Sequence, residues 1–269
     1  MKIEELNSLA FSLRLKVLTM IARAKTGDAA TSLATLEVLL ALYLGEDNTH
    51  RILNVDPRRP KGSERDYVVV SNAGIAPAWY VCLAQAGFFE GSELDFYGQA
   101  HALLRATPDV KIPGVDAGVK TVGRGLAIAE GMARALTLDK KSNHVFVILT
   151  DEDLKLGLTW ESMLSVTYDR LKNLTLVCAH SRSALLSPLQ DKMKAFGWNV
   201  LTVANGHDLK ELVLALARAK EFKRGPTCIL APTVLSKGVP FAEGKLVYRG
   251  ALFSDQEMAE ARAYLTAKL

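Results

Sequence analysis

The sequence predicts an α/β protein with a doubly wound, mostly parallel sheet and helices on both faces. Through the second half of the chain, short apolar segments alternate with amphipathic helical segments. That order is typical of parallel strands joined by helical crossovers. The apolar segments lack polar alternation, which indicates a sheet that is covered on both faces. No Pro/Gly/Ser-rich linker interrupts the 269 residues, so we expect a single domain over residues 1–269.

The individual elements follow from the spacing of apolar residues and from the signals at segment ends. Expected helices cover Leu6–Arg23, Leu33–Leu44, Ala76–Ala86, Gly123–Leu136, Leu156–Leu171, Pro188–Phe196 and Leu209–Ala219. Expected strands cover Tyr67–Val70, His144–Leu149, Leu174–Cys178, Asn199–Val203 and Thr227–Ala231. Ser187 is the expected cap of a helix with Pro188 at its first position. Ser254 and Glu257 form a capping-box pattern that opens a last helix.

Composition excludes several classes of protein. The net charge of +4 is mild and its basic residues are dispersed, whereas a nucleic-acid binder carries a dense basic stripe. No apolar stretch is long enough to span a bilayer, so we expect no membrane association. The acidic start of the chain argues against a signal peptide. Cys82, Cys178 and Cys228 lie far apart in apolar runs, which indicates buried thiols and a cytoplasmic location.

One segment stands out as a candidate site. Thr150-Asp151-Glu152-Asp153 follows a buried strand, and ligands of such sheets bind at the carboxyl ends of the strands. Three acids there are compatible with a metal site, because hard divalent cations prefer carboxylate oxygens. The same acids are compatible with a solvated turn that favours the N-terminus of the next helix. The residues alone leave both interpretations open.

Further motifs run along the chain in a fixed order. They are Thr26-Gly27-Asp28 with Glu37 and Leu42-Tyr43, Ala76-Pro77-Ala78, Pro113-Gly114-Val115, Gly123-Arg124-Gly125-Leu126 with Gly131-Met132-Ala133, Asp151 with Gly157 and Trp160-Glu161, Gly206-His207-Asp208, and Lys237-Gly238-Val239. In this order the chain resembles the N-terminal half of transketolases over nearly its whole length. Its length is similar to that of the N-terminal subunit of split transketolases, whose second half is a separate chain.

The resemblance implies the thiamine-diphosphate-binding fold, with thiamine diphosphate and Mg²⁺ as cofactors. The cofactor-binding positions that it implies are Gly123, Gly125, Asp151, Glu152 and Ser181. The metal positions that it implies are Asp151, Ser181 and the carbonyl of Ser183. In this family the cofactor lies between two halves. The resemblance therefore also implies a hetero-oligomer of two plus two chains, in which the partner is a transketolase-like C-terminal subunit that binds the pyrimidine.

The sequence departs from the family pattern mainly at functional positions. Family histidines are replaced at Asp28, in Ala73-Gly74 and in Ala106-Thr107, and the late Trp-His-Gly motif becomes Tyr248-Arg249-Gly250. A family glycine becomes Glu152 and the metal-binding asparagine becomes Ser181. An aspartate near a diphosphate adds about 4 kcal/mol of repulsion at about 4 Å, unless its side chain turns away.

Two functions remain open on these residues. One is the N-terminal subunit of a thiamine-diphosphate-dependent enzyme that transfers a two-carbon ketol or related unit. The other is a non-catalytic scaffold or regulatory subunit that has lost cofactor binding. The family's activating glutamate belongs to the absent half, and His101 and His180 are only the nearest histidines to the altered segments. We therefore assign no catalytic residue.

Overall fold

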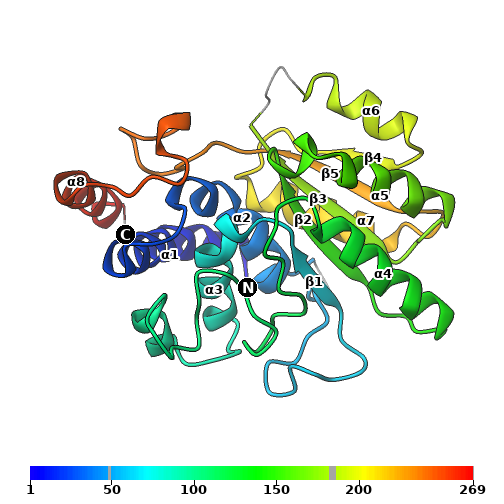
Figure 1. The fold of residues 1–269 in the computed structure, drawn as a ribbon, viewed down its shortest axis with the longest axis horizontal. Coiled ribbons are helices and arrows are strands. Elements are labelled where there is room, and N and C mark those ends of the chain that lie inside the picture. The colour runs from blue at the N-terminus through cyan, green and yellow to red at the C-terminus, as the bar shows by residue number, and fades with distance from the viewer. Residues whose placement is uncertain (48–49, 182–185, 269) are drawn as a thin grey trace.

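A parallel β-sheet forms the centre of the molecule (Figure 1). The structure is a computed structural model that describes residues 1–47, 50–181 and 186–268. Within these residues the strand order is β1-β2-β3-β5-β4, and every neighbouring pair is parallel. The strands are β1 (Tyr67–Val70), β2 (Val145–Thr150), β3 (Leu174–His180), β4 (Asn199–Thr202) and β5 (Thr227–Pro232). The predicted parallel sheet is confirmed.

Each predicted helix is present, with shifts at its ends. The helices are α1 (Ile3–Ala24), α2 (Ala29–Leu44), α3 (Ala76–Gln85), α4 (Gly125–Leu138), α5 (Gly157–Tyr168), α6 (Leu189–Ala195), α7 (Leu209–Glu221) and α8 (Asp255–Thr266). Short 3₁₀ turns include η1 (Ala73–Ile75), η2 (Gly91–Phe96), η3 (Asp153–Lys155) and η5 (Leu246–Tyr248). Two of these turns, η3 and η5, carry residues of the candidate site.

Helices cover both faces of the sheet, as the apolar strands predict. Successive residues of a strand point to opposite faces, so Phe146 and Ile148 join one core while Val147 and Leu149 join another. Helices α4 and α5 contribute to the second core, and α2 and α7 to the first, with α1 and α3 packed against α2 (Figure 1). The sheet is therefore the middle layer of a doubly wound α/β fold.

Two expectations about helix ends differ in outcome. The capping box is present: the Glu257 amide donates to Ser254 Oγ at 3.3 Å, and the Ser254 amide donates to the Glu257 carboxylate at 2.8 Å. The expectation for Ser187 and Pro188 is wrong. The ψ of Pro188 is 104° and therefore extended, so Pro188 itself is the N-cap residue of α6, and its side chain has no oxygen that could cap the helix.

Parallel pairing brings the ends of three strands to one edge of the sheet. Thr150 of β2 pairs with Ala179 of β3, and Ala179 pairs with Ala231 of β5. The segments that follow these strands therefore start side by side at the carboxyl edge, where open α/β sheets bind ligands.

The cysteines lie as expected. Cys82, Cys178 and Cys228 are free and buried, and burial raises the pKa of each thiol. None of the helices in the described part of the chain combines the length and the apolar character needed to cross a membrane.

Candidate functional site

A pocket of about 340 Å³ opens at the carboxyl edge of the sheet. The segments after β2, β3 and β5 and the segment around η5 form its walls. Its lining residues are Asp151, Lys155, Ser181, Thr233, Val234, Leu235, Gly244, Leu246 and Arg249. A narrow space of about 20 Å³ adjoins it and shares Asp151, Ser181 and Arg249 with it, while Glu152 lines only the narrow space. The structure thus brings together Asp151, Glu152 and Ser181, three of the predicted site residues.

Asp151 lies in this pocket with one oxygen satisfied and one free. The side chain is only 5% exposed. Its Oδ2 atom accepts hydrogen bonds from the Ser181 amide at 3.0 Å and from the Ser181 hydroxyl. Its Oδ1 atom is buried and has no hydrogen-bond partner among the described residues. Because a buried carboxylate oxygen without a partner is costly, this atom is suited to a bound cation or donor.

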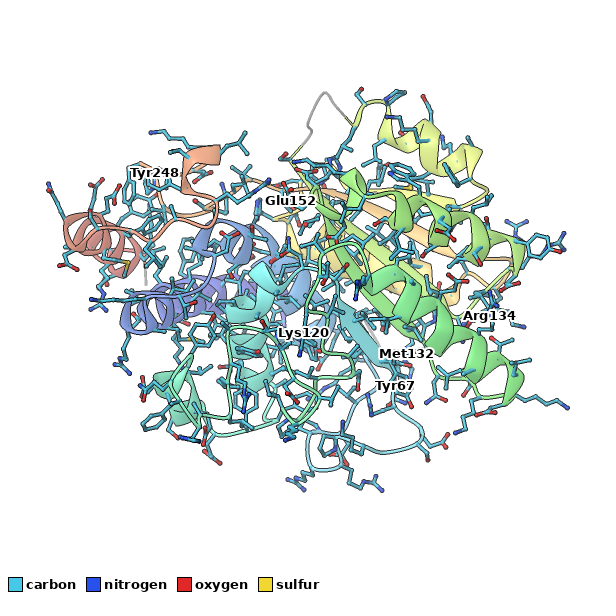
Figure 2. All side chains as sticks on the ribbon, viewed as in Figure 1. Tyr67, Lys120, Met132, Arg134, Glu152 and Tyr248 are labelled. Carbon is cyan, nitrogen blue, oxygen red and sulfur yellow. The ribbon has the colours of Figure 1, made fainter. Side chains whose placement is uncertain are left out.

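Arg249 and Lys155 bring positive charge to the same pocket. The Arg249 guanidinium donates through Nη1 to Glu152 Oε1, and Lys155 Nζ donates to the same oxygen at 2.8 Å. The Nε atom of Arg249 is buried without a partner among the described residues. Figure 2 shows Glu152 on the side of the sheet that faces the C-terminal segment carrying Tyr248. Glu152 therefore pairs with two cations, and one N–H of Arg249 stays available.

The neighbouring Asp153 holds the turn in place. It is fully buried. Its Oδ1 atom accepts from the Ser71 hydroxyl at 2.5 Å and the Gly123 amide at 2.8 Å. Its Oδ2 atom accepts from the amide and hydroxyl of Thr150 at 2.8 and 3.0 Å. These bonds join the ends of β1 and β2 to the loop before α4, so Asp153 has a structural role that the row of three acids did not reveal.

Gly123 and Gly125 lie beside this network. Gly123 has φ +84°, and a Cβ there would meet Leu156 Cδ1 at 2.6 Å. The Gly125 amide donates to Ser71 Oγ at 3.0 Å, and a Cβ there would meet Ser71 Cβ at 2.3 Å. Close approach requires glycine at both positions. Neither glycine is among the residues that line the pocket at the carboxyl edge, and their contact with a cofactor stays a prediction.

Asp28 and Gly74, two positions where this sequence replaces a family histidine, lie side by side in the structure. Asp28 caps α2, with its Oδ1 accepting from the Thr31 amide at 3.1 Å and its Oδ2 from the Thr31 hydroxyl at 2.5 Å. A Cβ at Gly74 would lie 3.2 Å from Asp28 Oδ2. Gly74 therefore leaves room for the Asp28 carboxylate, which turns toward Thr31. The capping also explains why α2 begins at Ala29, four residues before the predicted start.

The remaining predicted positions have different outcomes. Ser181 contacts Asp151, as described above. Ser183 lies outside the described residues. His101 is exposed, and His180 ends β3 next to Ser181. Neither histidine lines the pocket at the carboxyl edge.

Lys155 and Arg249 are site residues that the sequence did not predict. A signal existed for both. Lys155 follows Glu152 by three residues, and Arg249 stands where the family has a histidine. The sequence could not show that both side chains contact Glu152, because Arg249 and Glu152 are 97 positions apart.

The residues of the pocket fit a metal-bound diphosphate better than a free metal ion. No group of three or more histidine, cysteine or acidic side chains within the described ranges could hold a metal alone. Magnesium commonly takes only one or two protein carboxylates and completes its shell with phosphates and water. Asp151 offers one free carboxylate oxygen, and Arg249 offers a free N–H of the kind that binds phosphate.

Fold and pocket together define an α/β protein with a polar pocket at the carboxyl edge of its parallel sheet, where such folds bind ligands. The chain belongs to the transketolase family, since residues 6–268 match the family described as transketolase, thiamine diphosphate binding domain. The predicted family and fold are confirmed. The family description names thiamine diphosphate, in agreement with the predicted cofactor.

Curated relatives include split-transketolase chains of similar length. The chain is 31% identical over 263 residues to the 6-deoxy-6-sulfo-D-fructose transketolase subunit SqwG of Clostridium sp. (strain MSTE9), covering 94% of this chain and 93% of that relative. It is 26% identical to an apulose-4-phosphate transketolase subunit of Phocaeicola vulgatus, covering 97% of this chain and 94% of that relative. These relatives confirm the prediction that the chain resembles the N-terminal subunit of a split transketolase.

Other relatives are much longer. The chain is 30% identical to human transketolase over 93% of its own length but spans only 40% of that protein. The solved structure of transketolase from Campylobacter jejuni superposes with a TM-score of 0.87 at 24% identity, covering 99% of this chain and 43% of that one. At this identity the superposition supports the fold alone.

Proposed function

We propose that this chain is the diphosphate-binding subunit of a two-chain transketolase, with Asp151 as its magnesium ligand. The observation that carries the proposal is that two residues lining one pocket each have a buried polar atom without a partner among the described residues, Asp151 Oδ1 and Arg249 Nε. One atom suits a cation and the other suits an anion, as a magnesium-bound diphosphate requires. Ser181 holds Asp151 through Oδ2, which leaves Oδ1 available to the ligand.

Thiamine diphosphate, when bound, supplies the carbon chemistry for moving a two-carbon ketol unit. The residues of this chain have a different task, which is to hold the diphosphate end. Arg249 and Lys155 provide positive charge, and the Asp153 network keeps the turn that carries Asp151 rigid. The pyrimidine end and its activating acid are assigned to a second, C-terminal-type chain, in a complex of two plus two subunits.

An exposed apolar surface on α4 and α5 supports the proposed partner. Ile128, Gly131, Ala135 and Leu138 lie at helical spacing along α4 and are exposed. On α5, Leu164 and Tyr168 lie one turn apart and are 60% and 87% exposed. Helices α4 and α5 pack against each other, and Met132 and Arg134 mark α4 in Figure 2. Exposed apolar residues that cluster on one face mark interaction sites.

The proposed substrates are sugars that carry an anionic group. Two of the relatives are named for a sulfo sugar and a sugar phosphate. The proposed compartment is the cytoplasm, which the three free, buried cysteines support.

A non-catalytic subunit is the second candidate function. The pairing of Glu152 with Arg249 and Lys155 favours it, because the cations that would bind phosphate already have an anionic partner. The two candidates separate on whether the assembled complex holds the cofactor.

The decisive experiment is the thiamine diphosphate content of the complex, purified with its partner chain in Mg²⁺ and again after EDTA treatment. We expect near one cofactor per pair of chains in Mg²⁺ and loss of cofactor in EDTA. Asp151→Asn should weaken cofactor binding about tenfold or more, because it removes a charged ligand. Glu221→Gln, at an exposed position at the end of α7, serves as the control and should leave binding unchanged. A complex that contains the partner but no cofactor would support the non-catalytic candidate instead.

A further inference from the structure

Glu152 holds the two cations that the proposed ligand would need. Its Oε1 atom accepts from both Arg249 and Lys155. Its backbone begins the η3 turn, which the buried Asp153 fixes to the ends of β1 and β2. The turn is therefore rigid, while the Glu152 side chain remains 32% exposed and can rotate toward solvent.

We propose that Glu152 is an internal counter-anion, which occupies Arg249 and Lys155 in the free chain and is displaced by the diphosphate of the ligand. This inference rests on the proposed function, because it takes a metal-bound diphosphate as the ligand of the pocket. It assigns Arg249 and Lys155 as phosphate-binding residues and Glu152 as the residue that controls their availability.

The exchange is favoured by the similar chemistry of the two anions. Carboxylate and phosphate oxygens both accept hydrogen bonds from guanidinium groups, often in the same planar arrangement. Arg249 lines both the open pocket and the narrow space beside it, and its buried Nε atom has no partner among the described residues. A phosphate that enters the pocket can therefore reach Arg249 before Glu152 leaves it. Each cation therefore keeps an anionic partner at each stage of the exchange.

The replacement of a family glycine by Glu152 should then change the affinity of the pocket for diphosphates. A glycine in the family pattern contributes no charge, whereas Glu152 must give up two ion pairs before the ligand is fully bound. The pocket should consequently bind diphosphates more weakly than it would with a neutral residue at this position. Loss of Glu152 should strengthen binding, and the gain should depend on Arg249.

Inorganic pyrophosphate with Mg²⁺ is a suitable probe, because it contains only the part of the cofactor that this pocket would hold. Titration calorimetry on the full chain at fixed ionic strength would compare the wild type with Glu152→Gln, Arg249→Gln and the double variant. We expect Glu152→Gln to bind about tenfold more tightly and Arg249→Gln about tenfold less tightly. In the double variant, the gain from Glu152→Gln should be clearly smaller than in the presence of Arg249.

Two further variants separate this effect from a general change in charge. Glu243→Gln removes a carboxylate that pairs with Lys237 instead, beside the pocket residue Gly244, and should change affinity much less than Glu152→Gln. Glu152→Asp keeps the charge but shortens the reach to Arg249, and should give a smaller gain than Glu152→Gln. It also provides a test if the glutamine variant does not fold.

The outcomes are distinct. If the wild type binds pyrophosphate and neither Glu152 variant binds it more tightly, the inference is overturned while the proposed function stands. An equal gain with and without Arg249 also overturns it. If no variant binds pyrophosphate and the assembled complex contains no thiamine diphosphate, the inference and the proposed function fail together.

Discussion

Two glycines of helix α4 lie in opposite environments, and they offer a matched test of the packing beside the site. A Cβ at Gly125 would lie 2.3 Å from Ser71 Cβ, whereas a Cβ at Gly131 would meet no atom within 4 Å. Gly125→Ala should destabilise the chain by about 2 kcal/mol or more, because the end of β1 must shift. Gly131→Ala should stabilise it by up to about 1 kcal/mol, because alanine favours the helix. Urea unfolding at 25 °C would measure both.

This comparison also tests the role of Asp153. The Gly125 amide and the Asp153 carboxylate both bind the Ser71 hydroxyl, so displacement of Ser71 should disturb the turn that carries Asp151. A Gly125→Ala chain as stable as the wild type would contradict the close contact that the structure describes.

Single residues also show where sequence reasoning stops. The replacements at Asp28 and Gly74 could each be recognised from the sequence, and a turned Asp28 side chain was one expected way to relieve repulsion. That the two positions are neighbours could not be recognised, because contacts across 46 positions depend on the fold. The structure shows the small residue making room for the acid. The two departures are therefore one local change.

At the scale of elements, a buried histidine ties β2 to β3. His144 precedes β2, and its Nε2 atom lies 2.8 Å from Thr175 Oγ1 on β3. Burial, together with Lys223 and Lys220, lowers the pKa of His144 to about 3 from the ordinary value of 6.5. The folded chain thus resists protonation at a pH where the unfolded chain accepts a proton. This difference makes the free energy of unfolding depend on pH.

The direction of this pH dependence follows from the pKa values of His144 in the folded and unfolded chain. The contribution of neutral His144 is fully present above pH 6.5 and is lost as the pH falls from 6.5 toward 3. At pH 5 this loss should lower the free energy of unfolding by about 2 kcal/mol relative to pH 7.5. Urea unfolding at both pH values would measure the loss.

His144→Gln should flatten this pH dependence, even though the variant is less stable at pH 7.5. His101→Asn, at an exposed position with φ +65°, should keep the dependence of the wild type. An unchanged slope in His144→Gln would show that other groups cause it.

The elements themselves were largely predictable, because apolar periodicity determines which segments form helices and buried strands. Their ends were less so. Helix α2 begins early because Asp28 caps it, and α6 begins late because the backbone of Pro188 is extended. Both ends depend on local hydrogen bonds and dihedral angles that apolar spacing does not encode.

At the scale of the whole molecule, the sequence predicted the edge of the sheet that carries the site but not the composition of the pocket. Asp151 and Ser181 follow neighbouring strands, so parallel topology brings them together. Arg249 reaches the same place from a C-terminal segment whose path no periodic pattern predicts. The chain therefore combines the proposed diphosphate pocket with exposed apolar residues on α4 and α5.

That face leads to a prediction about assembly. Leu164 of α5 is 60% exposed, and Leu214 of α7, on the opposite side of the sheet, is 45% exposed. If the partner chain binds over α4 and α5, Leu164→Glu should weaken the complex about tenfold or more, because a charge would be buried in an apolar interface. Leu214→Glu should leave the complex intact.

Native mass spectrometry of the co-purified chains would measure the fraction assembled. Both variants should remain folded, because each leucine is exposed. Equal assembly of the two variants would place the partner elsewhere, whereas selective loss in Leu164→Glu would assign α4 and α5 to the interface with the partner chain.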